Sequence, residues 1–316
     1  MNTLQRLFMC VAALATVSTP AAAQSTTIPL DPRATFLLYD YSYDSAMPPV
    51  ILPLNTLGAA PGQWLRIQSS GAFSMGGQVD TQHRLLAVFS SSNALQPGYF
   101  TQRVLGALPA GPTLTTGPTY WTVPTDIPQD FLASLTGHAD YVLVPVPAGA
   151  THLFLGTFDS HYADNTDPNG DWTAVVTVVP TPPLPGTGEN IELRVGVDAP
   201  AVALPSQHTA TAGSTITVET RCPLDRIGGS LWLLVGDVLP ASSPVLAVLP
   251  SLWMSSTFVV IDVGVWPTTV GSAATFSLVV PAGLQGNAVV FQSAAFTPQA
   301  RNGSYQATIA HRVLLQ

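Results

Sequence analysis

The sequence predicts an all-β protein built from two β-sandwiches in tandem after a cleaved signal peptide. Three observations lead to this fold class. The chain holds 29 Pro and 25 Gly among its 316 residues, and short apolar runs alternate with them, a pattern typical of short strands joined by turns. Only 9% of the residues are charged and 47% are hydrophobic, which excludes general disorder. A mature length of about 290 residues fits two domains.

Residues 1–23 have the three parts of a secretory signal peptide. Arg6 supplies the positive charge, residues 7–17 form the apolar stretch, and three alanines end at Ala23 before the expected cleavage site. The apolar stretch is about half as long as the roughly 20 residues of a membrane span. We therefore expect a secreted protein, located outside the cell, at its surface or in the periplasm, with no membrane insertion. Cys222 would be its only cysteine.

The first predicted domain covers residues 24–180. Its apolar runs predict strands between turn-forming residues, and the segment after Pro128 predicts a short helix or turn at 129–135. Residues 181–190 are rich in Pro and Gly, which predicts a stiff linker. The strands are expected at residues 34–39, 63–69, 84–89, 140–144, 152–156 and 173–179.

The second predicted domain covers residues 191–316. Seven or eight apolar runs within it match the size of one immunoglobulin-like sandwich, although no cysteine pair is present to join the sheets. Its strands are expected at residues 191–197, 214–219, 230–235, 245–249, 258–263, 275–280, 288–291 and 305–315.

The charge pattern limits the classes of molecule that the protein can bind. The formal net charge is −8, and the ten basic residues form no basic stripe that could neutralise phosphates. We therefore expect no nucleic-acid partner.

The most informative segment is residues 159–171, called the acidic loop below. Four of the eighteen acidic residues lie in it, together with two Asn and one Gly, between two apolar runs. Carboxylates crowded into one loop repel each other, and Ca²⁺ relieves this repulsion because it accepts about six to eight oxygen ligands in flexible geometry. The candidate ligands are the oxygens of Asp159, Asp164, Asn165, Asp167, Asn169 and Asp171.

The acidic loop has two other possible interpretations. The spacing Asn165-x-Asp167-x-Asn169-Gly170 imitates the first half of an EF-hand, but Val176 stands where that motif needs a bidentate carboxylate, and the flanks are strands. A true EF-hand is thereby excluded. The loop could also be a solvated turn, because Asp, Asn, Gly and Pro are common turn residues.

A resemblance adds to this interpretation. Residues 147–156, followed by Asp159-x-x-Tyr162-x-Asp164-Asn165, resemble the calcium site of the PA-I-type galactophilic lectins and of galactose-binding-like sandwiches in secreted bacterial proteins, and residues 61–67 and 71–76 resemble an early strand and loop of that family. The resemblance implies a jelly-roll or galactose-binding-like domain. It also implies Ca²⁺ held by the carbonyls of Met75 and His161 and by three side chains of the acidic loop, with sugar hydroxyls bound to the metal.

Four further residues are candidate sugar contacts. Gln78, Asp80 and His83 lie in the stretch where the lectins contact their ligand, and Trp121 is a candidate stacking platform. The second half resembles an Ig-like domain of secreted proteins from planctomycete-like bacteria, at residues 210–218, 231–235, 274–283 and 287–292. That resemblance implies no function.

The sequence therefore predicts a secreted, non-enzymatic, lectin-like protein that binds carbohydrate through Ca²⁺. One alternative is an extracellular structural or adhesion protein in which Ca²⁺ only stiffens a loop. Another is a secreted hydrolase with an unrecognised site, for which Asp40 and Asp44 are the best carboxylate pair.

Overall fold

The computed structural model describes residues 24–37, 45–77, 84–96, 104–110, 127, 129–134, 141–159, 161–187, 191–221, 230–254, 258–266, 273–298, 300 and 304–316. These residues form antiparallel-rich sheets and one short 3-10 helix, so the all-β prediction is confirmed. The signal peptide lies outside the described residues. So do Asp40, Asp44, Gln78, Asp80, His83, Trp121 and Cys222.

The strands up to residue 179 pair only with one another and form two sheets. One sheet has the order β1-β9-β3-β7, and the other has the order β2-β8-β4-β5 with β6 also paired to β4. All of these pairings are antiparallel. The elements are β1 (Gln24–Pro29), β2 (Val50–Pro53), η1 (Leu54–Leu57), β3 (Trp64–Ser70), β4 (Leu85–Ser90), β5 (Ala107–Leu108), β6 (Phe131–Ser134), β7 (Tyr141–Pro145), β8 (His152–Thr157) and β9 (Thr173–Val179).

Alternating side chains place the first core between these two sheets. Leu65 and Ile67 of β3 are fully buried, whereas Arg66 between them is only partly buried, as expected for a strand with one inner face. They belong to one apolar cluster with Phe89 of β4 and Phe154 of β8, which come from the opposite sheet. The arrangement is a sandwich whose loops at one end carry the candidate site.

The strands from residue 192 onward form a second pair of sheets and a separate two-stranded sheet of β14 and β15. The smaller sheet has the order β10-β12-β17, and the larger has the order β11-β20-β18-β13-β16 with β19 on β18. β11 runs parallel to β20. The elements are β10 (Glu192–Val197), β11 (Gln207–Ala210), β12 (Thr215–Arg221), β13 (Leu231–Pro240), β14 (Ala247–Leu249), β15 (Leu252–Trp253), β16 (Val259–Val265), β17 (Ala273–Val279), β18 (Asn287–Phe296), β19 (Tyr305–Ala307) and β20 (His311–Leu315).

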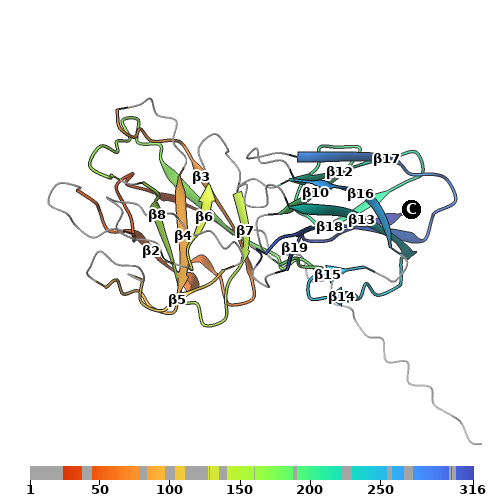
Figure 1. Cartoon of the computed structure of the whole chain (residues 1–316), viewed down its shortest axis with the longest axis horizontal. Coiled ribbons are helices and arrows are strands. Elements are labelled where there is room, and N and C mark those ends of the chain that lie inside the picture. Colours follow the sequence, from red (N-terminus) through yellow and green to blue (C-terminus); the bar gives the residue numbers. More distant parts are fainter. Residues whose placement is uncertain are drawn as a thin grey trace, which may run out of the picture.

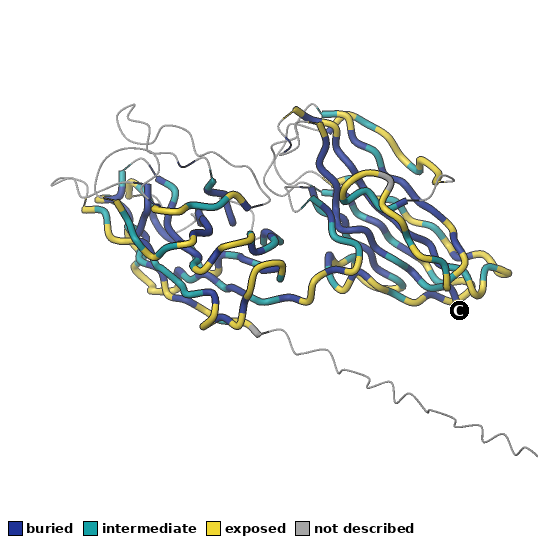
Figure 2. Tube along the Cα trace, turned by 90° about the horizontal axis from the view of Figure 1, so that it is seen from below, coloured by how far each residue is buried: buried dark blue, intermediate teal, exposed yellow. Residues whose placement is uncertain are grey.

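The two groups of strands occupy opposite ends of the molecule (Figure 1). In each half, most buried residues lie in strands, but β16 and β17 of the second half contain no buried residue (Figure 2). Between the halves, Trp64 and Val179 form a buried apolar cluster with Ile309. The guanidinium groups of Arg66 and Arg194 lie 4.0 and 5.6 Å from the ring centroid of Tyr141.

Three expectations about elements were wrong. Residues 131–134 form strand β6 instead of a helix or turn, because their apolar side chains are buried along β4. Residues 34–37 are not a strand, because the Leu37 N–H donates to Thr35 Oγ1 in a local turn. The single strand expected at 305–315 is two strands, β19 and β20, separated at residues 308–310.

Candidate functional site

The acidic loop follows β8 and is paired with residues 71–77, called the facing loop below, which follow β3. The Ser74 N–H donates to the Thr166 carbonyl at 2.8 Å, and the Thr166 N–H donates to the Ser74 carbonyl at 3.0 Å. This pairing places Met75 of the facing loop beside Asp164 and Asn165. Two segments about ninety residues apart in the chain thus meet where the resemblance requires a Met75 carbonyl.

The hydroxyl of Tyr162 anchors the start of the acidic loop. The side chain is fully buried, and its oxygen accepts from Thr35 Oγ1 at 3.1 Å and from the Asp159 N–H at 3.4 Å. It donates to the Thr157 carbonyl at 3.3 Å. A single buried hydroxyl therefore ties the end of β8, the acidic loop and the segment after β1 together. In the sequence, Tyr162 is visible only as part of a motif, and nothing in that motif predicts this role.

The three predicted side-chain ligands lie in the part of the loop that Tyr162 fixes. Asp159 and Asn165 are 5% and 3% exposed. Asn165 donates from Nδ2 to the Pro32 carbonyl at 3.0 Å, while its Oδ1 is enclosed and accepts no hydrogen bond from the described residues. Oδ1 of Asp164 is likewise enclosed without a donor among them. Asp164 also approaches the facing loop, because a Cβ on Gly76 would lie 3.5 Å from its Oδ2.

His161 contacts the same carboxylate. Its Nδ1 lies 3.5 Å from Oδ2 of Asp164, and the two side chains are 44% and 40% exposed. The site therefore has a buried side at Asp159 and Asn165 and a solvent-facing side at His161 and Asp164.

In the second half of the acidic loop, residues 167–171, the side-chain oxygens accept backbone hydrogen bonds. Oδ1 of Asp167 accepts from the N–H groups of Gly170 and Asp171 at 2.9 and 3.3 Å, and its Oδ2 accepts from the Trp172 N–H at 3.1 Å. Asn169 Oδ1 also accepts from the Asp171 N–H, at 3.3 Å. These side chains satisfy backbone donors of a tight turn, as Asp and Asn commonly do.

The turn docks against the facing loop. Oδ1 of Asp171 accepts from the Ala72 N–H at 3.1 Å, and the rings of Trp172 and Phe73 lie 5.1 Å apart at their centroids. Gly71 has φ +72°, and a Cβ there would lie 2.1 Å from the Asp171 carbonyl oxygen. Only glycine fits this contact, since it combines a left-handed backbone with a missing side chain.

The candidate ligand atoms of the acidic loop can be compared with the ligands that the expected metal prefers. Within the described residues, no group of three or more His, Cys, Asp and Glu side chains could hold a metal ion. A site at this loop would therefore need the amide oxygen of Asn165 and backbone carbonyls besides Asp159 and Asp164. Such an all-oxygen set fits Ca²⁺, which binds amide and backbone oxygens, but does not fit Zn²⁺.

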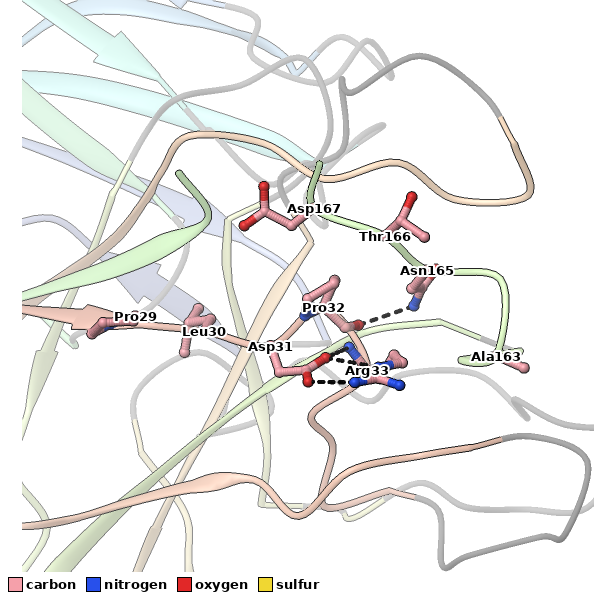
Figure 3. A pocket seen from close by; sticks show the side chains of 9 residues that line it. All are labelled: Pro29, Leu30, Asp31, Pro32, Arg33, Ala163, Asn165, Thr166 and Asp167. Atoms are coloured by element: carbon pink, nitrogen blue, oxygen red, sulfur yellow. Dashed lines mark hydrogen bonds and ion pairs between the residues drawn. The ribbon is translucent and has the colours of Figure 1, made fainter. Parts of the chain in front are cut away.

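A pocket lies on the other side of Asn165 (Figure 3). The segment after β1 forms one wall and carries an ion pair between Asp31 and Arg33, with Arg33 Nη2 2.9 Å from Asp31 Oδ2. This pair was not predicted from the sequence. The only signal was an acid and an arginine two residues apart, a spacing too common to indicate a site.

Comparisons with known proteins leave the family open. No protein-family model and no curated protein matches the chain. Among solved structures, it is similar to a β-glucuronidase from Bacteroides uniformis, with 8% sequence identity and a TM-score of 0.26. The match covers 92% of this chain but only 32% of the enzyme's chain, and at that TM-score it carries no argument about activity. Among the described residues, no helix has the length and apolar character needed to cross a membrane.

Proposed function

We propose that this protein is secreted, binds Ca²⁺ at the first half of the acidic loop, and uses the ion to bind carbohydrate without catalysing a reaction. Asp159, Asp164 and Asn165 would supply side-chain oxygens, and Met75 and His161 would supply backbone carbonyls. Asp167, Asn169 and Asp171 would shape the turn that holds this half in place, because their oxygens already accept backbone hydrogen bonds.

One observation carries the calcium proposal: the enclosed Oδ1 of Asn165 accepts no hydrogen bond from the described residues. Leaving a buried acceptor without a partner costs about 1–3 kcal/mol, and more when the group is charged. The Oδ1 of the neighbouring Asp164 likewise accepts no hydrogen bond from the described residues. A hard cation would satisfy both oxygens at once and would neutralise the repulsion between Asp159 and Asp164.

The carbohydrate proposal follows from the open side of the site. His161 and Asp164 face solvent, so a bound ion would keep coordination positions that no side chain on the inner side can reach. Vicinal hydroxyls of a sugar are neutral oxygen ligands that can replace water there. The net charge of −8 also favours a neutral ligand over an anionic one.

Thermal unfolding in millimolar calcium and in chelator tests the metal site. Calcium at 100 times its Kd should stabilise the folded protein by about 2.7 kcal/mol. Asp164→Asn should remove most of this gain. Asp262→Asn is the matched control, since it removes the same charge from the other sandwich and should keep the gain. An equal response of all three proteins would show that the ion binds elsewhere.

A glycan array probed in calcium and in chelator tests the second half of the proposal. Calcium-dependent binding that Asp164→Asn abolishes is the expected result. A calcium-stabilised protein that binds no glycan would instead favour the alternative of a structural ion in an extracellular or adhesion protein.

A further inference from the structure

The pocket behind the acidic loop has the volume of a ligand site. It measures about 560 Å³, within the range of about 300–1,000 Å³ found for small-molecule pockets. Two segments line it, one running from the end of β1 to Arg33 and one from the acidic loop (Figure 3). The lining residues are Pro29, Leu30, Asp31, Pro32, Arg33, Ala163, Asn165, Thr166 and Asp167.

The Asp31–Arg33 pair gives the pocket a rigid polar wall. Arg33 donates from Nε to Asp31 Oδ1 at 3.1 Å and from Nη2 to Oδ2 at 2.9 Å, while its backbone N–H also donates to Oδ1 at 2.8 Å. Burial by itself raises the pKa of Asp31, but these hydrogen bonds outweigh it and hold the pKa below its ordinary value. The carboxylate therefore stays charged, and the fork-like pairing fixes both planar groups.

The pair still offers hydrogen-bonding capacity. Arg33 Nη1 has no hydrogen-bond acceptor among the described residues, and both side chains are more than one-third exposed. A donor and an acceptor held side by side match two neighbouring hydroxyl groups, each of which can both donate and accept. The exposed ring of Pro29 adds apolar surface of the kind that contacts the C–H groups of a sugar.

Charge selects against ionic ligands. Asp31 and Arg33 neutralise each other, and Asp167 directs its oxygens to three backbone N–H groups of its own turn. The pocket therefore has a formal charge of −1 in a chain of net charge −8, which disfavours anions. Both carboxylates of the lining already accept hydrogen bonds, Asp31 from Arg33 and Asp167 from its own turn, which weakens their attraction for a cation. A neutral, hydroxyl-rich ligand fits this balance best.

Asn165 connects this pocket to the calcium loop. Its Nδ2 donates to the carbonyl of Pro32, the residue between Asp31 and Arg33, and its Oδ1 is the buried oxygen that lacks a donor. The amide group is planar, so an ion on Oδ1 would also fix Nδ2 and the wall that Nδ2 holds. A ligand in the pocket and an ion at the loop would then strengthen each other's binding by the same factor.

We propose that this pocket binds a neutral polyol of monosaccharide size through Asp31 and Arg33, and that calcium strengthens this binding through Asn165. The inference rests on the proposed calcium site. It differs from that proposal in placing the hydroxyl-recognising groups in the pocket instead of on the ion alone.

The experiment measures sugar binding by saturation-transfer NMR and calcium binding by thermal unfolding, on the same protein samples. The probes are galactose, glucose and mannose as neutral sugars, glucuronate as an anion and glucosamine as a cation. At least one neutral sugar should bind, and more tightly in calcium than in chelator. Arg33→Met should weaken it about tenfold or more, the loss expected for a hydrogen bond to a charged group. The calcium-induced rise in Tm should remain.

Two further variants complete the design. Arg221→Met is the matched control, since Arg221 pairs with Glu219 in the other sandwich and should leave sugar binding unchanged. Asn165→Asp keeps an oxygen for calcium but removes the donor to Pro32. At calcium concentrations that saturate the variant, as judged from its own rise in Tm, sugar should bind it no more tightly than in chelator.

The outcomes separate the two proposals. No calcium response in the wild type would overturn the proposed function itself. A calcium response together with sugar binding that Arg33→Met leaves intact would place the sugar on the ion and overturn only the pocket. Binding of glucuronate or glucosamine alone, or of no probe despite a calcium response, would also overturn the pocket proposal.

Discussion

Tyr162 shows how one buried side chain can hold a polar loop in place. Its hydroxyl bonds to Thr35, to the Asp159 N–H and to the Thr157 carbonyl, and the side chain is fully buried. These bonds order the start of the acidic loop as the chain folds, so part of the entropic cost of ordering it is met on folding. If the proposed calcium site exists, the ion would then have less ordering to perform when it binds.

Tyr162→Phe tests this role. Removing the hydroxyl leaves the buried groups that it contacts without this hydrogen-bond partner. The free energy of unfolding in chelator should therefore fall by about 1–3 kcal/mol. Calcium should also bind more weakly, because Asp159 loses its anchor. Urea unfolding and calcium titration measure the two effects. Tyr305→Phe, which removes one hydrogen bond to Pro250 in the other sandwich, should leave calcium affinity unchanged. Equal calcium affinity in all three proteins would contradict the anchoring role.

At the scale of elements, the parallel pair β11 and β20 contains two histidines in contact. His208 Nε2 lies 3.2 Å from His311 Nδ1, and the rings are stacked with centroids 5.5 Å apart. Burial, together with the nearby charge of His208, lowers the pKa of His311 to about 3, and burial lowers the pKa of His208 as well. Both rings are therefore neutral in the folded protein at neutral pH.

The pair predicts a loss of stability in acid. The unfolded chain takes up a proton on each histidine near its ordinary pKa of 6.5, whereas folded His311 does so only near 3. Between these values the unfolded state binds more protons, so the free energy of unfolding falls as the pH falls. From pH 7 to pH 5, His311 alone should account for a loss of about 2 kcal/mol.

Urea unfolding at the two pH values measures this loss. His311→Leu should remove that part of the pH dependence, whatever its effect on stability at pH 7. His152→Gln, in the other sandwich, should leave it in place. A pH dependence that is unchanged in His311→Leu would refute the assignment.

At the scale of the whole molecule, the two sandwiches share a contact surface. Trp64 and Val179 of the first half form an apolar cluster with Ile309 of the second. Separately, the ring of Tyr141 is contacted by Arg66 from its own half and by Arg194 from the other. Cation–π contacts contribute about 0.5–1 kcal/mol each at exposed sites. With the apolar contacts, they should couple the unfolding of the two halves.

Calorimetry tests the coupling. The wild type should unfold in one transition, while the double variant Arg194→Ala/Ile309→Ala should unfold in two, because Ile309→Ala alone removes about 2 kcal/mol or more of packing. Arg221→Ala, whose ion pair with Glu219 lies within one sandwich, should keep a single transition. Two transitions in the wild type would show that the halves are independent.

The sequence by itself determined the features that depend on local pattern. Alternating and continuous apolar runs between Gly and Pro gave the all-β class, and the expected strand at 173–179 coincides with β9. Turn chemistry and crowded carboxylates marked the acidic loop. These signals are readable because strand period and turn preference are properties of neighbouring residues.

Only the tertiary structure decided which contacts each residue of the acidic loop makes. Asp164 and Asp167 are the same residue type three positions apart. Asp167 accepts hydrogen bonds from backbone N–H groups of its own turn, whereas Asp164 lies close to Gly76 of the facing loop. The link from Asn165 to Pro32 spans 133 positions, and the strand at 131–134 exists because β4 lies beside it. Such contacts depend on which distant segments the fold brings together, and no local pattern encodes them.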